Sequence, residues 1–336
     1  MKNPLVSVNI LTYNGEKLIE ECLKSVLSQT YPNIEILVID NNSTDKTMEK
    51  IQISKSKFQT FPIEIIENKK NLGFAVGHNQ GIKKSKGDYV LCLNQDVVLD
   101  KDFVKNAVEA MEKDEKIGSV QGKLLKTPMT NDQFPIIDAT GLLMFKNRRV
   151  VTRGQGEEDK NQYAAGEIFG VDGAAPLYRR AALEDIKIND EYFDEDFFCY
   201  KEDVDLAWRL RLYDWKSIYE PRAIAYHLRG AGERAVKNYI SVALARRKLS
   251  KFAKFYSFKN QRLMQIKNEL PNLFFHDFFS ILIKEIGAWL YVLCFEHYTI
   301  KAIRELLKQI PEAWQKRKII MSRKRVSSGE IKKWFV

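Results

Sequence analysis

Cysteine is scarce in this chain, and its spacing forms no framework. Only 4 of the 336 residues are cysteines, and no CxxC pair occurs. Disulfide-stabilised domains and zinc modules need closely spaced cysteines, so both classes are excluded and a reducing cytosol is the expected environment. We expect the four thiols to be buried fillers. They are Cys22, Cys92, Cys199 and Cys294.

Glycine-rich phosphate cradles are also missing. No GxGxxG follows the first predicted strand, and no GxxxxGK[ST] occurs anywhere in the chain. Dinucleotide-binding dehydrogenases and P-loop enzymes are therefore excluded. With 17 Gly, 9 Pro, 45% hydrophobic and 29% charged residues, the composition is neither collagen-like nor disordered. It is typical of a soluble globular protein.

Long apolar runs are absent as well. Residues 1–4 lead straight into an apolar strand pattern, without the longer apolar stretch and small-residue cleavage site of a signal peptide. Between residues 273 and 295, charged residues leave at most ten uninterrupted apolar positions, which is too few to span a bilayer. The expected location is the cytoplasm, with peripheral attachment to the inner face of the cell membrane as an alternative.

Positive charge is missing from most of the chain and concentrated at its end. Residues 1–230 hold 32 Lys and Arg against 36 Asp and Glu, a net charge of −4, whereas residues 231–336 hold 22 against 8, a net charge of +14. A basic tail favours an anionic partner, such as a membrane surface, or simply solvated helices. No nucleic-acid partner is expected, because no DNA- or RNA-binding motif occurs and the first part of the chain is not basic.

What the chain does contain is a regular alternation of β-branched apolar runs and amphipathic helical patterns. This alternation predicts an α/β fold with a mostly parallel central sheet and helices on both faces. After a predicted helix at 103–111 and a strand at 118–121, residues 127–166 are polar and rich in turn formers, which indicates loops, short strands and a mobile lid. The first four predicted strands are 6–11, 34–39, 63–66 and 89–93.

Polar residues follow these strands, where an open parallel sheet binds its ligands. Asp40 could accept hydrogen bonds from a ribose or a base, and Asp96 could hold Mg²⁺ or Mn²⁺ against a diphosphate, because both ions take oxygen ligands. Each aspartate alone also fits a turn former or helix N-cap. The strand-end candidates are Thr12, Tyr13, Asn14, Asp40, Asn42, Asn71, Gly73, Phe74, Asn94, Gln95 and Asp96.

The densest group of acids and aromatics lies at residues 193–209, where a helix is predicted from 202 to 213. Glu202, Asp203 and Asp205 fall at the start of this helix, where an acid could act as a general base or could simply favour the positive end of the helix dipole. Residues 221–227 predict an edge strand that ends in His227. A histidine leaving a strand near acids is either structural or a metal ligand.

Six separated segments resemble, in sequence order, the inverting family-2 glycosyltransferases of GT-A fold, particularly the rhamnosyltransferase-like branch. The resemblance covers about residues 5–230. It implies a nucleotide-sugar donor site that extends to Asn79, with Asp40 near the nucleoside and Asp96 in the metal position of a DxD-like motif. Asn94 and Gln95 depart from that motif, which keeps only its final acid. Binding of Mg or Mn would therefore depend mainly on Asp96. The segments are 8–14, 38–45, 71–79, 93–97, 173–174 and 193–209 with His227.

The same resemblance assigns the chemistry of the second half. Asp203 is implied as the catalytic base, Glu202 as support for the acceptor, and His227 as a second metal ligand. The reaction is then a single in-line displacement that inverts the anomeric carbon. The residues implied on the acceptor side are Gly173, Ala174, Asp194, Phe198, Tyr200 and Glu202.

We therefore predict a GT-A catalytic domain at 1–232, with a nucleotide-sugar half at about 1–122 and an acceptor half at about 123–232. A basic helical region follows at 233–336. The predicted function is transfer of a sugar, plausibly rhamnose, to a glycan or lipid-linked acceptor in cell-surface polysaccharide synthesis. A non-catalytic carbohydrate-binding relative and, less favoured, a nucleic-acid-binding protein are the alternatives. A homo-oligomer is compatible with the sequence.

The helical region carries an apolar stripe with a basic end. We expect the stripe to pack on the catalytic domain, and docking at a membrane interface is the alternative. The basic end comprises residues 316–318 and 323–325. The stripe consists of Leu282, Ile286, Trp289, Leu290 and Leu293.

Overall fold

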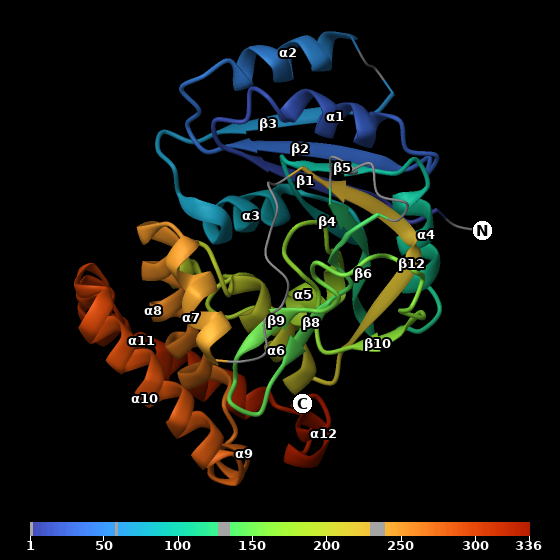
Figure 1. Ribbon diagram of the computed structural model, residues 1–336. Helices are drawn as coiled ribbons and strands as arrows, with labels where there is room; N and C mark the ends of the chain where they lie inside the picture. Colours follow the sequence, from blue (N-terminus) through green and yellow to red (C-terminus); the bar gives the residue numbers. More distant parts are fainter. Residues whose placement is uncertain (1–2, 58–59, 127–134, 229–238) are drawn as a thin grey trace.

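The computed structural model describes residues 3–57, 60–126, 135–228 and 239–336, and it confirms the α/β class (Figure 1). Within these residues one sheet of ten strands has the order β10-β12-β6-β11-β4-β1-β2-β3, with β5 paired to β12 and β7 paired to β6. Helices cover the sheet, and the C-terminal helices form a separate layer beside α6 (Figure 1).

The strands of the sheet, together with the small hairpin β8–β9, are short except for β6 and β12. Their bounds are β1 (Val6–Thr12), β2 (Ile34–Asp40), β3 (Ile63–Glu67), β4 (Tyr89–Asn94), β5 (Val97–Leu99), β6 (Ile117–Lys126), β7 (Ile137–Ala139), β8 (Leu142–Met144), β9 (Val150–Thr152), β10 (Gly166–Ile168), β11 (Leu177–Arg179) and β12 (Lys216–His227).

Helices alternate with the first strands and then dominate the end of the chain. Their bounds are α1 (Ile19–Leu27), α2 (Thr47–Lys57), α3 (Gly73–Lys84), α4 (Phe103–Met111), α5 (Arg180–Ile186), α6 (Glu202–Leu212), α7 (Tyr239–Lys248), α8 (Lys251–Asn268), α9 (Pro271–His276), α10 (Phe278–Phe295), α11 (Ile300–Arg323) and α12 (Ser328–Lys332). Two short 3₁₀ turns, η1 (Glu195–Phe197) and η2 (His297–Thr299), interrupt the loops.

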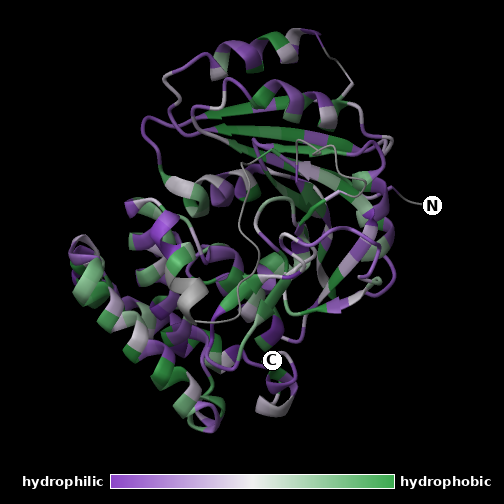
Figure 2. Cartoon of the chain, viewed as in Figure 1, coloured by the Kyte–Doolittle hydropathy of each residue, from purple (hydrophilic) through white to green (hydrophobic). Residues whose placement is uncertain are grey.

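The first half of the sheet is parallel, as predicted. β1 pairs in parallel with both β2 and β4, and β2 pairs in parallel with β3. Strands β1 and β2 are hydrophobic along most of their length (Figure 2), because a strand covered on both faces needs apolar side chains in both directions. This half of the sheet therefore has the open, parallel form that places ligand sites at its carboxyl edge.

Helix α3 begins at Gly73, where a contact with a distant loop fixes its first turn. The Phe198 carbonyl accepts hydrogen bonds from the N–H groups of Phe74 (2.6 Å) and Ala75 (3.2 Å), which closes the first turn of the helix. Gly73 has a φ of +83°, and a Cβ there would lie 2.5 Å from the same carbonyl. The start of α3 therefore depends on a loop that lies 125 residues later in the chain. The residues next to Gly73 in the sequence do not show this dependence.

The prediction that residues 221–227 form an edge strand is wrong. β12 pairs in parallel with β6 and is also paired on its other side, by β10 near its start and β5 near its end. Pro221 escapes the usual exclusion from interior strands because the register of β12 against β6 shifts between Glu220 and Ile224. This irregularity lets the strand continue to His227.

The polar segment after β6 forms short strands, as predicted. β7 extends the sheet and β8 pairs with β9 in a hairpin. Residues 127–134 of the predicted lid lie outside the described part of the chain, and so does the predicted domain boundary between residues 232 and 233.

The C-terminal helices share the hydrophobic core of the α/β part. Leu263 and Met264 of α8 and Ile320 of α11 belong to the same buried cluster as Trp208 and Tyr178. The predicted apolar stripe nevertheless does not pack inward. Only Trp289 contacts a core cluster, whereas Leu290 is 57% exposed. The other stripe residues, Leu282, Ile286 and Leu293, are also exposed.

By length and composition, α10 is apolar enough to cross a membrane, in contrast to the prediction. Its mean hydropathy is 1.7, and 11% of the helix is buried. Two of the charged residues that argued against spanning are paired, because Glu285 contacts both Lys284 and Arg262 of α8.

The cysteines only partly match the expectation. All four thiols are free; Cys22 and Cys92 are buried, Cys199 is half-buried and Cys294 is exposed. Cys294 lies on α10, most of whose side chains face away from the core.

Buried ion pairs tie the C-terminal helices to the α/β part. Lys267 of α8 contacts Asp194 and lies 2.8 Å from Asp205, and Lys316 of α11 lies 2.7 Å from Asp194. Burial raises the pKa of Asp194, but the two ammonium groups outweigh it and lower that pKa below its ordinary value. Lys316 is therefore an internal residue, not part of the exposed basic end that the sequence predicts.

Candidate active site

The carboxyl ends of β1, β2 and β4 meet at one edge of the sheet. The register pairs Thr12 with Asp40 and Leu11 with Asn94. The strand-end residues predicted from the sequence are therefore neighbours in space, as a nucleotide site at this edge requires.

Asp40 shapes the turn that follows β2. Its carboxylate accepts hydrogen bonds from the backbone N–H of Ser43 (2.9 Å) and from the Ser43 hydroxyl (2.5 Å). This is the turn-forming role that an aspartate at a strand end commonly has. Each carboxylate oxygen has a second lone pair, so the turn role and a contact to a nucleoside are compatible.

Gln95 ties the ends of β1 and β4 together. Its amide oxygen accepts hydrogen bonds from the Thr12 hydroxyl and the Tyr13 N–H, and its amide nitrogen donates to the Tyr13 carbonyl at 3.1 Å. Asn14, with φ of 48°, accepts a hydrogen bond from the Thr44 N–H at 2.8 Å. These residues build the rim, and the Tyr13 side chain, 44% exposed, remains free to contact a ligand.

The asparagines around α3 make hydrogen bonds that stabilise the fold. Asn79 is buried and binds both the N–H and the carbonyl of Phe193. Asn71 accepts a hydrogen bond from the Gly73 N–H at 2.9 Å, and Phe74 packs edge-on against Phe193. This part of the predicted donor site instead joins α3 to the loop that leads to Glu202. Asn42, with φ of 67°, lies in the turn after Asp40.

Asp203 lies in the first turn of α6 and faces the segment predicted to contact the acceptor. Its carboxylate accepts hydrogen bonds from the N–H groups of Gly173 (3.2 Å) and Val204 (2.8 Å). Burial and the nearby charge of Asp172 raise the pKa of Asp203 to about 6. A carboxylate with that pKa is ionised at neutral pH and is a stronger base than an ordinary aspartate.

Glu202 is the neighbour of Asp203 in the first turn of α6. Burial, followed by the charge of Asp203, raises the pKa of Glu202 well above its ordinary value. Its Oε2 atom is buried and has no hydrogen-bond partner among the described residues. The environment of Glu202 therefore favours the protonated form of its carboxyl group.

Asp172 is a site residue that was not predicted from the sequence. The Asp172 carboxylate accepts a hydrogen bond from the Ala174 N–H (3.1 Å), and the Gln121 side chain accepts one from the Asp172 N–H (2.7 Å). The Ala174 carbonyl in turn accepts a hydrogen bond from the Asn94 N–H (3.0 Å), which links this segment to the end of β4. The position of Asp172 directly before the matched residues 173–174 was the available signal.

The loop before Glu202 is held in a strained conformation. Phe198, Tyr200 and Lys201 all have positive φ, at 60°, 67° and 76°, which is costly for residues with side chains. Asn260 of α8 stabilises it, since its side-chain amide lies 2.8 Å from the Phe197 carbonyl and 2.7 Å from the Tyr200 carbonyl. The C-terminal region therefore positions Glu202 and Asp203, a role that the sequence did not indicate.

Among the residues implied on the acceptor side, Asp194 does not face a cleft. It is buried between the two lysines Lys267 and Lys316, so the structure assigns it to the ion pairs that hold the C-terminal helices. Phe198 stacks on Tyr256 of α8 with ring centroids 5.2 Å apart. Tyr200 is 44% exposed.

His227 and Asp96 lie side by side, as predicted, with 3.3 Å between His227 Nε2 and Asp96 Oδ1. The other ring nitrogen of His227 contacts the buried Asp138 at 2.8 Å. Burial lowers the pKa of His227, but hydrogen bonds to Asp138 and Asp96 outweigh it and raise the pKa to about 9.

This arrangement fits a divalent cation. A ligating histidine commonly donates its second nitrogen to a carboxylate, and Mg²⁺ commonly uses one or two protein ligands together with substrate phosphates. The described residues contain no cluster of three His, Cys, Asp or Glu side chains that could hold a metal alone. Asp96 and His227 would therefore share the ion with the diphosphate of a bound donor.

The sequence of this chain matches a family model and two curated relatives. The model of the glycosyl transferase family 2 matches residues 7–187, more than half of the chain. The poly-β-1,6-N-acetyl-D-glucosamine synthase of Staphylococcus epidermidis is 30% identical over 223 residues, which cover 66% of this chain and 50% of that protein. The Staphylococcus aureus (strain COL) synthase is 29% identical over 216 residues, covering 64% and 48%. The chain thus spans about half the length of these relatives.

Two solved structures resemble the fold. The mannosyltransferase PcManGT from Pyrobaculum calidifontis, in complex with GDP-Man and Mn²⁺, has a TM-score of 0.55 at 17% identity, covering 96% of this chain and 86% of that chain. Residues 1–349 of S. aureus TarS, in complex with UDP-GlcNAc, have a TM-score of 0.57 at 18% identity, covering 93% and 83%. Together with the family match, which includes β1 to β4 and their carboxyl edge, these findings show that this chain belongs to glycosyl transferase family 2 and is a glycosyltransferase.

Proposed function

We propose that this chain transfers an N-acetylhexosamine from a UDP-sugar to a glycan hydroxyl, with inversion at the anomeric carbon. The observation that carries the proposal is the position of Asp203 beside Glu202 at the start of α6, where the Asp203 carboxylate faces the Gly173 N–H at 3.2 Å and its pKa is raised to about 6. Asp203 is thereby available as a base at neutral pH.

In the proposed step, a carboxylate oxygen of Asp203 takes the proton of the acceptor hydroxyl as that oxygen attacks the anomeric carbon. The bond from that carbon to the diphosphate oxygen breaks, and its electron pair stays on the diphosphate. Glu202 Oε2 has no partner among the described residues, and in its protonated form this carboxyl group can donate a hydrogen bond that orients the acceptor. Because one displacement completes the transfer, no covalent enzyme intermediate is needed.

A divalent cation held by Asp96 and His227 would offset the negative charge that develops on the departing diphosphate. The rest of the donor site is assigned to the chain itself. Asp40 is proposed to contact the nucleoside, and Tyr13, at the exposed rim, is proposed to cover it. Gln95 keeps the two strand ends in register for this purpose.

The curated relatives support the choice of sugar, since both act in poly-N-acetylglucosamine synthesis by name. The rhamnosyl donor predicted from the sequence has no counterpart among the relatives described above and stays untested. Titration calorimetry in the presence of Mn²⁺ compares the donors directly. We expect UDP-GlcNAc to bind more tightly than dTDP-rhamnose or GDP-mannose, and tighter binding of dTDP-rhamnose would reverse the assignment.

We also propose that α10 holds the enzyme on an anionic membrane surface from the cytoplasmic side. Phe279 is 77% exposed and Ile283 is 60% exposed, and the region after residue 230 has a net charge of +14. One side of α10 packs inward through Ile281 and Val292, which favours a helix lying along the membrane surface rather than crossing the bilayer.

The double substitution Phe279→Glu with Ile283→Glu is expected to weaken binding to vesicles that contain phosphatidylglycerol by about tenfold or more, because a buried apolar side chain contributes about 1.5–3 kcal/mol. Co-sedimentation measures this. Ile53→Glu, which changes an exposed isoleucine on α2, is the matched control and should leave binding unchanged. Equal recovery of the wild type and the double variant in the supernatant would reject the role of α10.

A further inference from the structure

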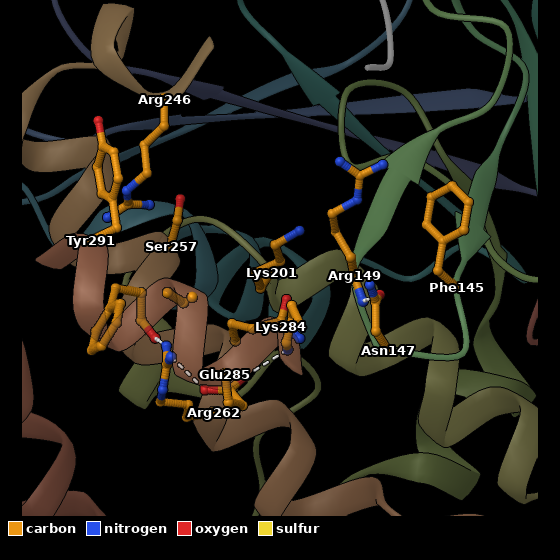
Figure 3. Close-up of a pocket in the computed structure, with 14 residues that line it drawn as sticks. Phe145, Asn147, Arg149, Lys201, Arg246, Ser257, Arg262, Lys284, Glu285 and Tyr291 are labelled. Atoms are coloured by element: carbon orange, nitrogen blue, oxygen red, sulfur yellow. Dashed lines mark hydrogen bonds and ion pairs between the residues drawn. The ribbon is translucent and has the colours of Figure 1, made fainter. Parts of the chain in front are cut away.

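A cavity of about 410 Å³ lies where the C-terminal helices meet the loop before Glu202 (Figure 3). Lys201, the residue directly before Glu202, lines it. Arg149 comes from the β8–β9 hairpin, Arg246 from α7, and Lys284 from α10, so separate parts of the chain build its walls (Figure 3). The donor site described above uses none of these side chains.

The lining is strongly positive. It includes five cationic side chains and one carboxylate, that of Glu285. The Glu285 carboxylate lies 2.5 Å from the Arg262 guanidinium and 2.6 Å from the Lys284 ammonium group. Glu296, outside the lining, pairs with Arg246 at 2.7 Å. Burial lowers the pKa of Lys201 and of Lys284, because their positive charges are incompletely balanced. The five cations are Arg149, Lys201, Arg246, Arg262 and Lys284.

One of these cations carries a buried donor atom without an acceptor. Arg262 Nε has no hydrogen-bond partner among the described residues, although another nitrogen of the same guanidinium donates to Glu285. An unpaired buried donor is costly, and a charged donor makes its strongest hydrogen bonds to anionic oxygens. Both features indicate an anionic ligand with several oxygen atoms, such as a phosphate or diphosphate.

Part of the lining is apolar. Phe145, Phe258, Ala288 and Tyr291 contribute to the same cavity, and α10, which provides two of these residues, exposes apolar side chains on its outer side. The cavity therefore combines an anion-binding part with an apolar part, next to a helix suited to a membrane surface. An amphiphile with a phosphorylated head fits both parts.

We infer that this cavity binds the phosphate or diphosphate group of a lipid-linked acceptor and thereby presents the acceptor sugar to Asp203. The inference rests on the proposed transfer to a glycan and specifies the chemistry of its acceptor. Lys201 connects the two sites, since it lines the cavity and directly precedes Glu202 and Asp203.

Titration calorimetry with farnesyl diphosphate, a water-soluble lipid diphosphate, tests the inference. The titration is run in EDTA on the full chain carrying Asp96→Ala, so that the donor site cannot hold the probe through a metal. Farnesyl diphosphate should bind at least about tenfold more tightly than farnesol, which lacks the anion, or inorganic pyrophosphate, which lacks the lipid. Because the donor site is disabled, this result does not depend on whether the protein binds UDP-GlcNAc.

Two variants locate the probe in the cavity. Arg149→Gln and Lys284→Gln should each weaken farnesyl diphosphate binding by about tenfold, since each removes a charge-assisted contact. Lys301→Gln, at an exposed lysine of α11, is the matched control and should have no effect. Arg149 is half-buried and tolerates substitution more readily than Lys284, and thermal unfolding verifies that each variant is folded.

The inference is overturned if farnesol binds as tightly as the diphosphate, which would leave only an apolar site, or if pyrophosphate binds equally, which would indicate free phosphate instead of a lipid. Unchanged binding in a folded Arg149→Gln variant would also overturn it. A protein that binds farnesyl diphosphate but no nucleotide-sugar would retain this site while rejecting the proposed function.

Discussion

Replacing Asp203 by asparagine is expected to lower turnover by about 10²–10⁴-fold, the range that a general base typically contributes. Asparagine is nearly the same size and can still accept a hydrogen bond from the Gly173 N–H, but it cannot take a proton from the acceptor. Donor affinity should stay near that of the wild type, because the residues assigned to the nucleotide lie at the ends of β1, β2 and β4, and Asp203 of α6 is not one of them. Steady-state kinetics with donor titration measures both quantities.

The pH dependence gives the same prediction a second readout. With the pKa of Asp203 raised to about 6, the base is protonated and inactive below that pH and ionised above it. The kcat/KM of the wild type should therefore rise as the pH increases through about 6 and then level off. The asparagine variant should lose this rise. Wild-type turnover in a folded Asp203→Asn variant would transfer the base role to Glu202 or Asp172.

Removal of divalent metal by EDTA is expected to lower transfer by about 10³-fold or more, and added Mn²⁺ or Mg²⁺ should restore it. A metal that offsets charge on a departing diphosphate contributes several kcal/mol, and each 1.4 kcal/mol corresponds to a factor of ten in rate. Asp96→Ala should cause a similar loss that added metal does not restore, because Asp96 and His227 are the two proposed ligands.

Two measurements separate this role from a loss of folding. Asp96→Ala should weaken donor binding in buffer that contains Mn²⁺ but not in EDTA, as measured by titration calorimetry. Asp190→Ala, at a largely exposed aspartate paired with Lys83, should behave as the wild type in both buffers. Full transfer activity in EDTA would contradict the assignment and would make the Asp96–His227 contact structural.

The parallel half of the fold could be predicted because its signals are local. Each of β1, β2 and β4 is a short apolar run, and each is followed by polar residues that the parallel register then brings to one edge. Glu202 and Asp203 were also marked by a local signal, since both begin a helix whose apolar spacing is visible in the sequence, but their separate roles were implied by the family resemblance. These features depend on neighbours within a few residues.

The features that sequence analysis missed depend on distant residues. Asp194 looked like a cleft residue because its partners Lys267 and Lys316 follow 73 and 122 positions later. Asp138 supports His227 across 89 positions, and Asn260 supports the loop at Phe197 across 63. Lys316 was predicted to belong to the exposed basic end, but its pairing with the distant Asp194 places it in the interior. Tertiary pairing of this kind leaves no periodic trace in one sequence.

The configuration of the released sugar tests the central claim most directly. Inverting enzymes can transfer the sugar to water, so proton NMR of UDP-GlcNAc hydrolysis needs no knowledge of the acceptor. The donor is α-linked, and a single displacement assisted by Asp203 predicts that β-N-acetylglucosamine appears first and later equilibrates with the α form. Initial release of the α form would contradict the account, because retention requires a mechanism other than the single displacement assigned to Asp203.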